Sequence, residues 1–193
     1  MLHNKYFWIL ERFLPDLGGE VYGRKLEGEI PISQKAIAIA LDELEGKGIL
    51  KSRKQGNIKY FSLNNKNPEA KDVILSAETM RKINFLNSHR KLAEIFRADD
   101  RVVGIFGSYS KGKETKSSDV DVFIIGPKVS RDYDKSGGLL DLDISIKYFL
   151  EKDFRKLARD KNNLIKEIIG NHILIFGAEK FIKIIWRDYY GFD

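Results

Sequence analysis

The amino-acid sequence predicts an α+β protein made of two domains and a helical connector. Helical periodicity and then two short β-type runs fill residues 1–66, and a long helical pattern fills residues 67–89. Residues 90–193 hold apolar, strand-like runs between further helical patterns. We therefore expect one domain on each side of the connector at residues 67–89.

The composition is that of a folded protein with a heavily charged surface. Hydrophobic residues make up 42% of the 193 residues, charged residues make up 32%, and the net charge is +6. The absence of cysteine excludes disulfides and thiolate zinc sites, and it suits an intracellular protein. No apolar run reaches the roughly 18 residues that span a bilayer. We expect a cytoplasmic protein without membrane contact.

The first domain is expected to contain helices and a hairpin. Ser33 is a favourable N-cap, and Gly46 and Gly48 follow the helix that it begins. A polar turn at Lys54–Asn57 separates two short β-type runs, which predicts a β-hairpin. The helices are expected at residues 7–14, 21–26 and 33–45, and the strands at residues 49–51 and 58–63.

Three helices followed by a hairpin resemble a winged helix-turn-helix of the kind found in small prokaryotic repressors. Residues 33–63 carry this resemblance. It implies that the helix beginning at Ser33 enters the major groove of duplex DNA, while the basic hairpin contacts the phosphate backbone. The implied DNA contacts are Gln34, Lys35, Lys51, Arg53, Lys54 and Lys59.

The helix that would read DNA favours a different interpretation. Its outward face continues with Ala38, Ile39 and Asp42, which are poor readers of base edges. Up to residue 75 the chain has 12 Lys and Arg against 10 Asp and Glu, a net charge of only +2. The alternative is that the first domain is a dimerisation or protein-docking module.

The connector is expected to be helical and covered. Pro68 suits the first turn of a helix, and a second helical stretch spans residues 90–97. The connector is too apolar for a flexible linker, so it should pack between the domains or against a second subunit. The sequence leaves the oligomeric state open, with a homodimer as one option.

The most informative segment lies between residues 101 and 126. Apolar runs at residues 102–106 and 120–125 predict two strands, and Asp119 and Asp121 should project from one face of the sheet. Two carboxylates held that close repel each other unless a cation lies between them. Gly107 and Ser108 follow the first run, where a turn can offer N–H groups to a phosphate. The pattern suggests metal-assisted phosphoryl chemistry.

A third strand is expected at residues 139–146. Asp141 and Asp143 lie two positions apart in it, and hence on one face. If this strand pairs beside the one that follows Asp119, a third carboxylate joins the first two. Three carboxylates can hold two divalent cations.

These residues resemble the nucleotidyltransferase superfamily that includes DNA polymerase beta, particularly its small prokaryotic members. The motifs "FGSYSKG", "SDVDVFII" and "LDLDISIKYF" carry the resemblance, which covers residues 90–155 closely. It implies a mixed sheet flanked by helices. It also implies a nucleoside triphosphate substrate, with nucleotide contacts from Gly107, Ser108, Lys111 and Ser118.

The resemblance further implies two Mg²⁺ ions bound by Asp119, Asp121 and Asp143. They would promote attack of an acceptor hydroxyl on the α-phosphate and release of pyrophosphate. Asp143 is preferred as the third acid because apolar residues and then a helix follow it, with Asp141 as the alternative. Lys111 stands where family members have arginine, so the bidentate fork of a guanidinium is absent.

The last expectations concern the C-terminal part of the chain and the substrate that accepts the nucleotide. A C-terminal helical extension is expected, with helices at residues 154–159, 164–169 and 179–189 and an apolar run at residues 172–176. One hypothesis is a nucleotidyltransferase coupled to DNA binding. The other is a transcriptional regulator or antitoxin-like protein whose nucleotidyltransferase domain senses nucleotide or modifies a partner protein. The acceptor and the preferred base stay open.

Overall fold

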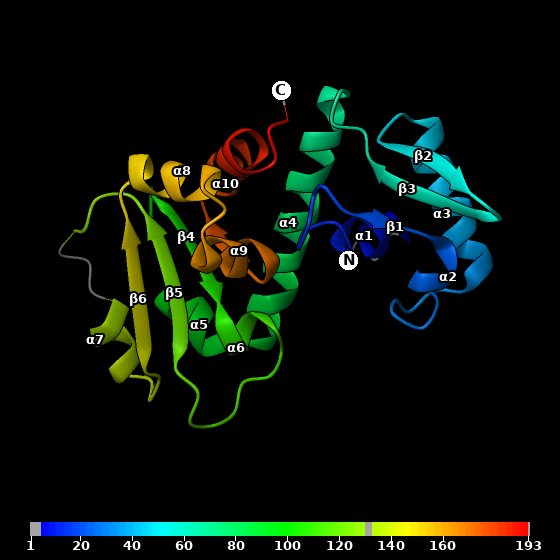
Figure 1. Cartoon of the computed structure of the whole chain (residues 1–193). Helices are drawn as coiled ribbons and strands as arrows, with labels where there is room; N and C mark the ends of the chain where they lie inside the picture. Colours follow the sequence, from blue (N-terminus) through cyan, green and yellow to red (C-terminus); the bar gives the residue numbers. More distant parts are fainter. Residues whose placement is uncertain (1–4, 130–132, 193) are drawn as a thin grey trace. The chain divides into compact units, whose positions relative to one another are not determined.

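The computed structural model describes residues 5–129 and 133–192. The chain divides into two compact units, Met1–Ala77 with Tyr190–Asp193, and Glu78–Tyr189. A three-stranded sheet lies in the first unit and a four-stranded sheet in the second (Figure 1). Within the described residues, no helix combines the length and the hydrophobicity that crossing a membrane requires.

The first unit combines helices with an antiparallel sheet of order β1-β3-β2. The Ser33 Oγ accepts a hydrogen bond from the Ala36 N–H at 3.3 Å, so Ser33 caps α3 as the sequence predicts. Gln55 pairs with Ile58, which reduces the hairpin turn to two residues. The elements are α1 (Lys5–Glu11), β1 (Glu20–Val21), α2 (Gly23–Leu26), α3 (Gln34–Gly46), β2 (Leu50–Gln55) and β3 (Ile58–Leu63).

Strand β1 is absent from the sequence-based expectation. Glu20 and Val21 pair with β3, so the helix expected at residues 21–26 begins only at Gly23. Two residues of extended chain are too short to show a period of two, which is why the pattern gave no sign of this strand. Strand β3 occupies the residues expected for it, 58–63. Strand β2 runs from Leu50 to Gln55, so Lys54 and Gln55, which were expected in the turn, belong to the strand.

One helix, α4 (Pro68–Ser88), fills the segment expected to connect the two domains. Its first half belongs to the first unit, and its second half, from Glu78 onward, belongs to the second unit. In the second unit, the Glu78 Oε1 lies 2.8 Å from the Nε2 of the fully buried His172. The Lys82 Nζ donates to the Ile175 carbonyl at 3.3 Å. These contacts fix the second half of α4 against the strand that ends the second sheet.

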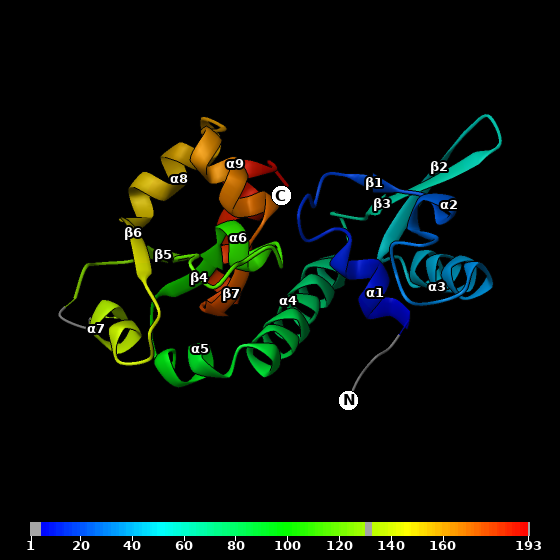
Figure 2. The same ribbon diagram turned by 90° about the horizontal axis from the view of Figure 1, so that it is seen from below.

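The second unit has a mixed sheet of order β6-β5-β4-β7, in which β6 is parallel to β5 and the other pairs are antiparallel. Helices cover both faces, α5 and α7 on one side and α8, α9 and α10 on the other (Figures 1 and 2). Its elements after α4 are α5 (Arg90–Ile95), β4 (Val102–Phe106), α6 (Gly107–Ser110), β5 (Val120–Ile125), α7 (Tyr133–Gly138), β6 (Ile144–Phe149), α8 (Glu151–Arg159), α9 (Asn163–Gly170), β7 (Ile173–Phe176), α10 (Ala178–Ile184) and a π-helical turn (Ile185–Tyr189).

Alternation along β5 divides its side chains between the two faces. Val120, Val122 and Ile124 enter a core that also contains residues of α4, α5 and α7. Phe123 points to the other face, where its ring centroid lies 5.6 Å from that of Phe181 in α10. Asp121 shares the face of Phe123, two positions along the strand. The carboxylate therefore lies on the side that α8, α9 and α10 cover.

The third strand of this unit begins later than expected. We predicted a strand at residues 139–146, but β6 starts at Ile144. Helix α7 ends at Gly138, and the N–H groups of Leu140 and Leu142 donate to the Gly137 carbonyl. Asp141 adopts a left-handed conformation with φ 55°. Asp141 and Asp143 thus precede the strand, and the expectation that they lie within it is wrong.

A buried ion pair lies directly before β4, between Asp99 and Arg101. The Arg101 guanidinium binds Asp99 through two contacts of 2.6 and 2.9 Å, and the Tyr133 hydroxyl donates to the same carboxylate at 2.5 Å. Burial alone would raise the pKa of Asp99, but the hydrogen bonds from Arg101 and Tyr133 outweigh it and hold that pKa far below its ordinary value.

We predict that Asp99→Asn lowers the free energy of unfolding by about 2 kcal/mol at pH 7, because one charged hydrogen-bond network is lost. A carboxyl group with a depressed pKa in the folded state stabilises the fold above its unfolded pKa, and this contribution disappears as the pH falls. The difference between wild type and Asp99→Asn should shrink below about pH 4. Urea titrations at several pH values measure this difference in the free energy of unfolding. A difference that stays constant with pH would contradict the lowered pKa of Asp99.

Candidate active site

The ends of three strands bring the expected site residues to one end of the second sheet. Strand β4 runs directly into α6, and its last residue, Phe106, pairs with Asp121 at the start of β5. Strand β6 begins at the same end, where the Val120 N–H donates to the Asp143 carbonyl at 2.7 Å. The turn at Gly107, the Asp119–Asp121 pair and the residue that precedes β6 are thus neighbours (Figure 1).

Gly107 is in contact with the carboxylate of Asp121. Its φ of 72° is a left-handed backbone conformation that residues other than glycine rarely adopt. A Cβ atom at this position would overlap an Asp121 carboxylate oxygen. The backbone of the turn can approach the carboxylate only because residue 107 is a glycine.

Asp121 lies in an environment that opposes its negative charge. Burial raises the pKa of its carboxyl group, and the charge of Asp119 raises it further, whereas Lys147 and Lys111 act in the opposite direction. The two aspartates are therefore close enough to repel each other, as their spacing predicts. A cation between them would relieve both the repulsion and the cost of burial.

The third carboxylate is not gathered with the other two. Asp143 is exposed and directly precedes β6, next to the start of β5 at the level of the backbone. Within residues 5–129 and 133–192, no three His, Cys, Asp or Glu side chains are grouped closely enough to hold a metal ion. The structure thus brings Asp119 and Asp121 together and leaves the side chain of Asp143 apart.

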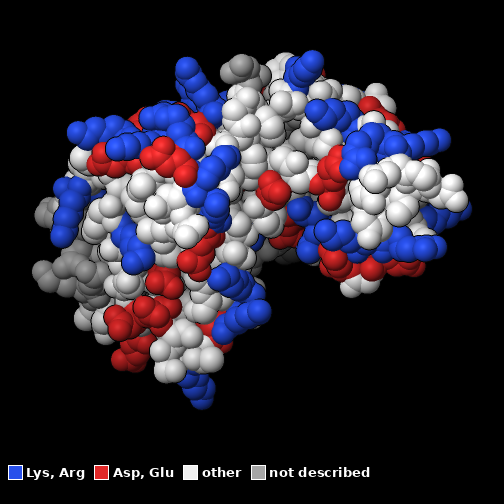
Figure 3. All heavy atoms as spheres, in the orientation of Figure 1, with Lys and Arg blue, Asp and Glu red and all other residues white. Residues whose placement is uncertain are grey.

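Acidic side chains nevertheless gather at this end of the sheet. In the space-filling view, Asp and Glu cluster over the lower ends of β5 and β6 (Figure 3). The exposed acids at these strand starts are Asp119, Asp141 and Asp143. A triphosphate cannot approach such a negative surface unless cations bind with it.

The expected phosphate contacts surround the turn after β4. Ser108 is half-buried in α6, and its carbonyl accepts hydrogen bonds from the N–H groups of Lys111 and Lys113. The Lys111 Nζ lies 3.3 Å from the Glu167 Oε1 of α9, so its charge is already paired with a carboxylate. The Ser118 Oγ accepts the Thr115 N–H at 2.9 Å and shapes the loop before Asp119.

Two further residues border the site without having been predicted. The Ser110 Oγ lies 3.0 Å from both the Gly107 and the Asn171 carbonyl oxygens, which ties α6 to the residue after α9. Lys147 shares the face of Asp121, because Asp121 pairs with Ser145 two residues earlier in β6. The predicted strand ended at residue 146, whereas β6 continues to Phe149; a correct end would have indicated Lys147 from the alternation of the strand.

In the first unit, the expected DNA contacts fall into two groups. Arg53 binds Glu20 through both carboxylate oxygens, at 2.8 and 2.6 Å. Lys59 binds Glu45 at 2.6 Å and Asp42 at 3.0 Å. These two cations are neutralised within the unit. The other expected contacts are exposed: Gln34, Lys35, Lys51, with its Nζ 3.4 Å from the Asn65 Oδ1, and Lys54.

Comparisons with known proteins address the second unit. The family described as "Polymerase beta, Nucleotidyltransferase" matches residues 90–181. A Methanocaldococcus jannaschii protein named "Putative protein adenylyltransferase MJ1547" is 38% identical over 98 residues, which cover 46% of the present chain and 72% of the relative. Comparison with solved structures gives no match. The matched residues include the β4–α6–β5 segment that carries the site.

Proposed function

Because the chain belongs to the polymerase beta nucleotidyltransferase family, we propose that it transfers a nucleoside monophosphate from a nucleoside triphosphate to a hydroxyl group of a partner protein. The observation that carries this proposal is Asp121, half-buried against the Gly107 backbone and repelled by Asp119. The name of the Methanocaldococcus jannaschii relative supports a protein as the acceptor and adenylyl as the group transferred.

Asp119 and Asp121 would hold divalent metal, with Asp143, the residue directly before β6, as the third ligand. The fit rests on the donor set, because oxygen ligands suit Mg²⁺ and the pKa of Asp121 is raised first by burial and then by Asp119. When bound, Mg²⁺ supplies Lewis-acid stabilisation of the charge that develops on the triphosphate. The family generally uses a nucleoside triphosphate and a divalent metal.

The protein groups would position the reactants for in-line displacement. Backbone N–H groups of the turn at Gly107 and Ser108 would contact the phosphates, and Lys111 would add positive charge. The acceptor oxygen forms a bond to the α-phosphorus, the bond to the bridging oxygen of the β-phosphate breaks, and pyrophosphate leaves. The hydroxyl proton passes to a carboxylate of the site. Positioning of this kind can contribute much of the barrier reduction.

A labelling experiment tests the nature of the acceptor. The protein is incubated with Mg²⁺, α-phosphorus-labelled nucleoside triphosphates and an extract of the cells in which it occurs. The products are then treated with protease or with nuclease. We expect label that protease releases and nuclease leaves. Label that only nuclease removes would contradict a protein acceptor, and no incorporation above a sample without enzyme would contradict the transfer itself.

The third carboxylate gives a graded prediction. Asp143→Asn should lower transfer by about tenfold or more, because its backbone is paired with Val120 beside Asp119. Asp141→Asn should change it by less than about threefold, since Asp141 lies in the preceding left-handed turn, which Asn adopts readily. Initial rates with saturating Mg²⁺ measure both. Equal losses, or a larger loss for Asp141→Asn, would contradict this order.

For the first unit we propose a winged-helix fold, because its order of elements is helix, strand, two helices and a hairpin around one antiparallel sheet. Duplex DNA is the second candidate partner of the chain. The exposed cations Lys35, Lys51 and Lys54 support it, whereas the engaged Arg53 and Lys59 limit it.

DNA binding, where it occurs, should depend only shallowly on salt. If the phosphates are contacted only by Lys35, Lys51 and Lys54, the predicted DNA contacts that no carboxylate holds, the slope of log K against log salt should not exceed about 3 in magnitude. If Arg53 and Lys59 left their carboxylates to contact phosphates, the slope would approach 5. Titrations of duplex DNA from the gene's own upstream region at several salt concentrations separate the two values.

A further inference from the structure

The first unit contains a pocket that the transfer reaction does not use, between α2, α3 and β3. Its volume is about 570 Å³. We infer that this hairpin pocket docks a segment of the partner protein in which acidic residues flank a large apolar side chain. The inference rests on the proposed function, since it states how the acceptor protein is recognised.

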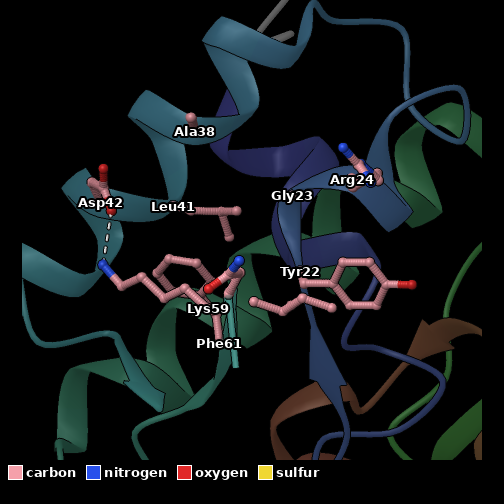
Figure 4. A pocket seen from close by; sticks show the side chains of 10 residues that line it. Tyr22, Gly23, Arg24, Ala38, Leu41, Asp42, Lys59 and Phe61 are labelled. Atoms are coloured by element: carbon pink, nitrogen blue, oxygen red, sulfur yellow. Dashed lines mark hydrogen bonds and ion pairs between the residues drawn. The ribbon is translucent and has the colours of Figure 1, made fainter. Parts of the chain in front are cut away.

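The interior of the hairpin pocket is apolar. The side chains of Leu41 and Phe61 form its floor, and they lie close together between the helix and the hairpin (Figure 4). Ala38 and Ile58 line it as well, and Ile58 is 41% exposed. Ile39, the next residue along α3, is 42% exposed. Burial of these groups by an apolar side chain is favourable because it removes them from water.

The volume suits a side chain rather than a flat contact. Pockets that bind compact organic groups measure roughly 300–1,000 Å³ and combine apolar walls with a few polar groups. Here the polar groups stand at the rim: Arg24 lies on one side of the view, and the Asp42–Lys59 pair lies on the other (Figure 4). A Leu, Phe or Trp side chain fits such a space.

The charges around the hairpin pocket select the flanking residues of the occupant. Four carboxylates of this surface have cationic partners: Asp42 and Glu45 bind Lys59, Glu20 binds Arg53, and Glu43 binds Lys5. Glu27, exposed at the end of α2, has no such partner within the described residues. Arg24 has no carboxylate partner among the residues that the structure describes.

Lys35 and Lys54 are exposed cations with no carboxylate partner within residues 5–129 and 133–192. The charged side chains of this surface that have no partner of opposite charge therefore carry a net positive charge. Carboxylates of the occupant would complement it, and the Arg24 guanidinium at the rim can donate two hydrogen bonds to one of them.

A polypeptide matches this surface better than DNA does. Next to the pocket, α3 presents Ala38 and Ile39, which offer base edges no hydrogen-bond donor. The hairpin cations Arg53 and Lys59, which would contact phosphates, are held by carboxylates. An acidic, apolar segment supplies both a group for the floor and charges for the rim.

Binding of synthetic peptides to the full-length protein, followed by fluorescence anisotropy, tests the inference. The probes carry Leu, Phe or Trp between Asp and Glu residues. Matched sets replace the acids with Lys or the apolar residue with Ser. We expect the acidic apolar set to bind, with at least about tenfold weaker binding for each matched set.

Two substitutions localise the binding. Arg24→Glu should weaken binding of the acidic apolar peptides at least about tenfold and improve binding of the Lys-flanked set, because the charge pairing is reversed. Lys25→Glu is the matched control outside the pocket and should change affinity by less than about threefold. Ala38→Glu places a carboxylate on the pocket wall at an exposed position and should also block the acidic set.

Three outcomes would overturn the inference. The first is that no peptide set binds the wild-type protein more tightly than it binds the Arg24→Glu variant. The second is that Arg24→Glu and Ala38→Glu leave the affinity unchanged. The third is that duplex DNA binds, that Arg24→Glu weakens this binding, and that the peptides do not bind, which would make the surface a nucleic-acid interface.

The catalytic variant separates this inference from the proposed function. A protein with both Asp119→Asn and Asp121→Asn should bind the peptides as wild type does. Peptide binding without any protein labelling would refute the transfer and leave the docking pocket intact. Labelling of the partner protein at an equal rate by wild type and Arg24→Glu would refute the docking pocket alone.

Discussion

Replacing Asp119 and Asp121 together with asparagine is expected to lower nucleotidyl transfer at least about a thousandfold. The amides keep the size of the side chains but carry no charge, and a bound metal contributes several kcal/mol of transition-state stabilisation. Each single variant should show most of the loss, since both carboxylates would hold the same ions. Rates of incorporation from an α-labelled nucleoside triphosphate measure the effect.

Thermal stability distinguishes lost function from lost fold in these variants. The pKa of Asp121 is raised in the folded state by burial and by Asp119, so its ionised form opposes folding at neutral pH, and stability rises as the pH falls. Asp121→Asn should therefore keep or raise the melting temperature in metal-free buffer. A fall in melting temperature in step with activity would contradict a functional role for the charge.

Gly107→Ala is expected to lower transfer by about a hundredfold, because a displacement of reacting groups by about 1 Å has effects of this size. The added Cβ overlaps the carboxylate of Asp121, so either the turn or the aspartate must move. The left-handed backbone adds about 1–2 kcal/mol of destabilisation. Transfer rates and urea denaturation of the same preparation measure the two effects.

Gly112→Ala is the matched control for this variant. Gly112 also has a positive φ, of 62°, but a Cβ there meets nothing within 4 Å. It should lose about 1–2 kcal/mol of stability through its backbone and keep most of the transfer rate. Equal losses of activity in the two variants would show that backbone strain, and not the contact with Asp121, explains Gly107→Ala.

The core of the site was predictable from sequence because it depends on local pattern. Strands β4 and β5 occupy the residues that their apolar runs indicate, and Asp119 and Asp121 interact as their spacing implies. The close contact between Gly107 and Asp121 follows from the pairing of Phe106 with Asp121, which the sequence does not state. A glycine after a strand reveals a turn, but not which side chain it meets.

The start of β6 was predicted wrongly because turn chemistry overrode the apolar pattern. Leu139 and Leu140 extend the apolar run backward from Ile144, yet Leu139 is 85% exposed at the end of α7. The glycines before them let the chain fold back through hydrogen bonds to the Gly137 carbonyl. The aspartates of this segment consequently lie in a turn rather than on a strand face.

The charge state of the hairpin could not be predicted from sequence either. Four Lys and Arg in ten residues indicate a basic surface, but Arg53 pairs with Glu20 and Lys59 with Glu45, each far away in the chain. Such pairs appear only once the sheet and α3 are assembled. They change which partner the first unit suits, from a phosphate backbone toward an acidic polypeptide.

The position of the transferred label tests the central claim most directly. The protein is incubated with Mg²⁺ and host extract in parallel with α-labelled and γ-labelled nucleoside triphosphate. Nucleotidyl transfer predicts that α-label stays on the acceptor protein while γ-label is released as pyrophosphate, and that Asp119→Asn with Asp121→Asn abolishes both. Retention of γ-label on the acceptor, or identical results for wild type and the double variant, would contradict the account.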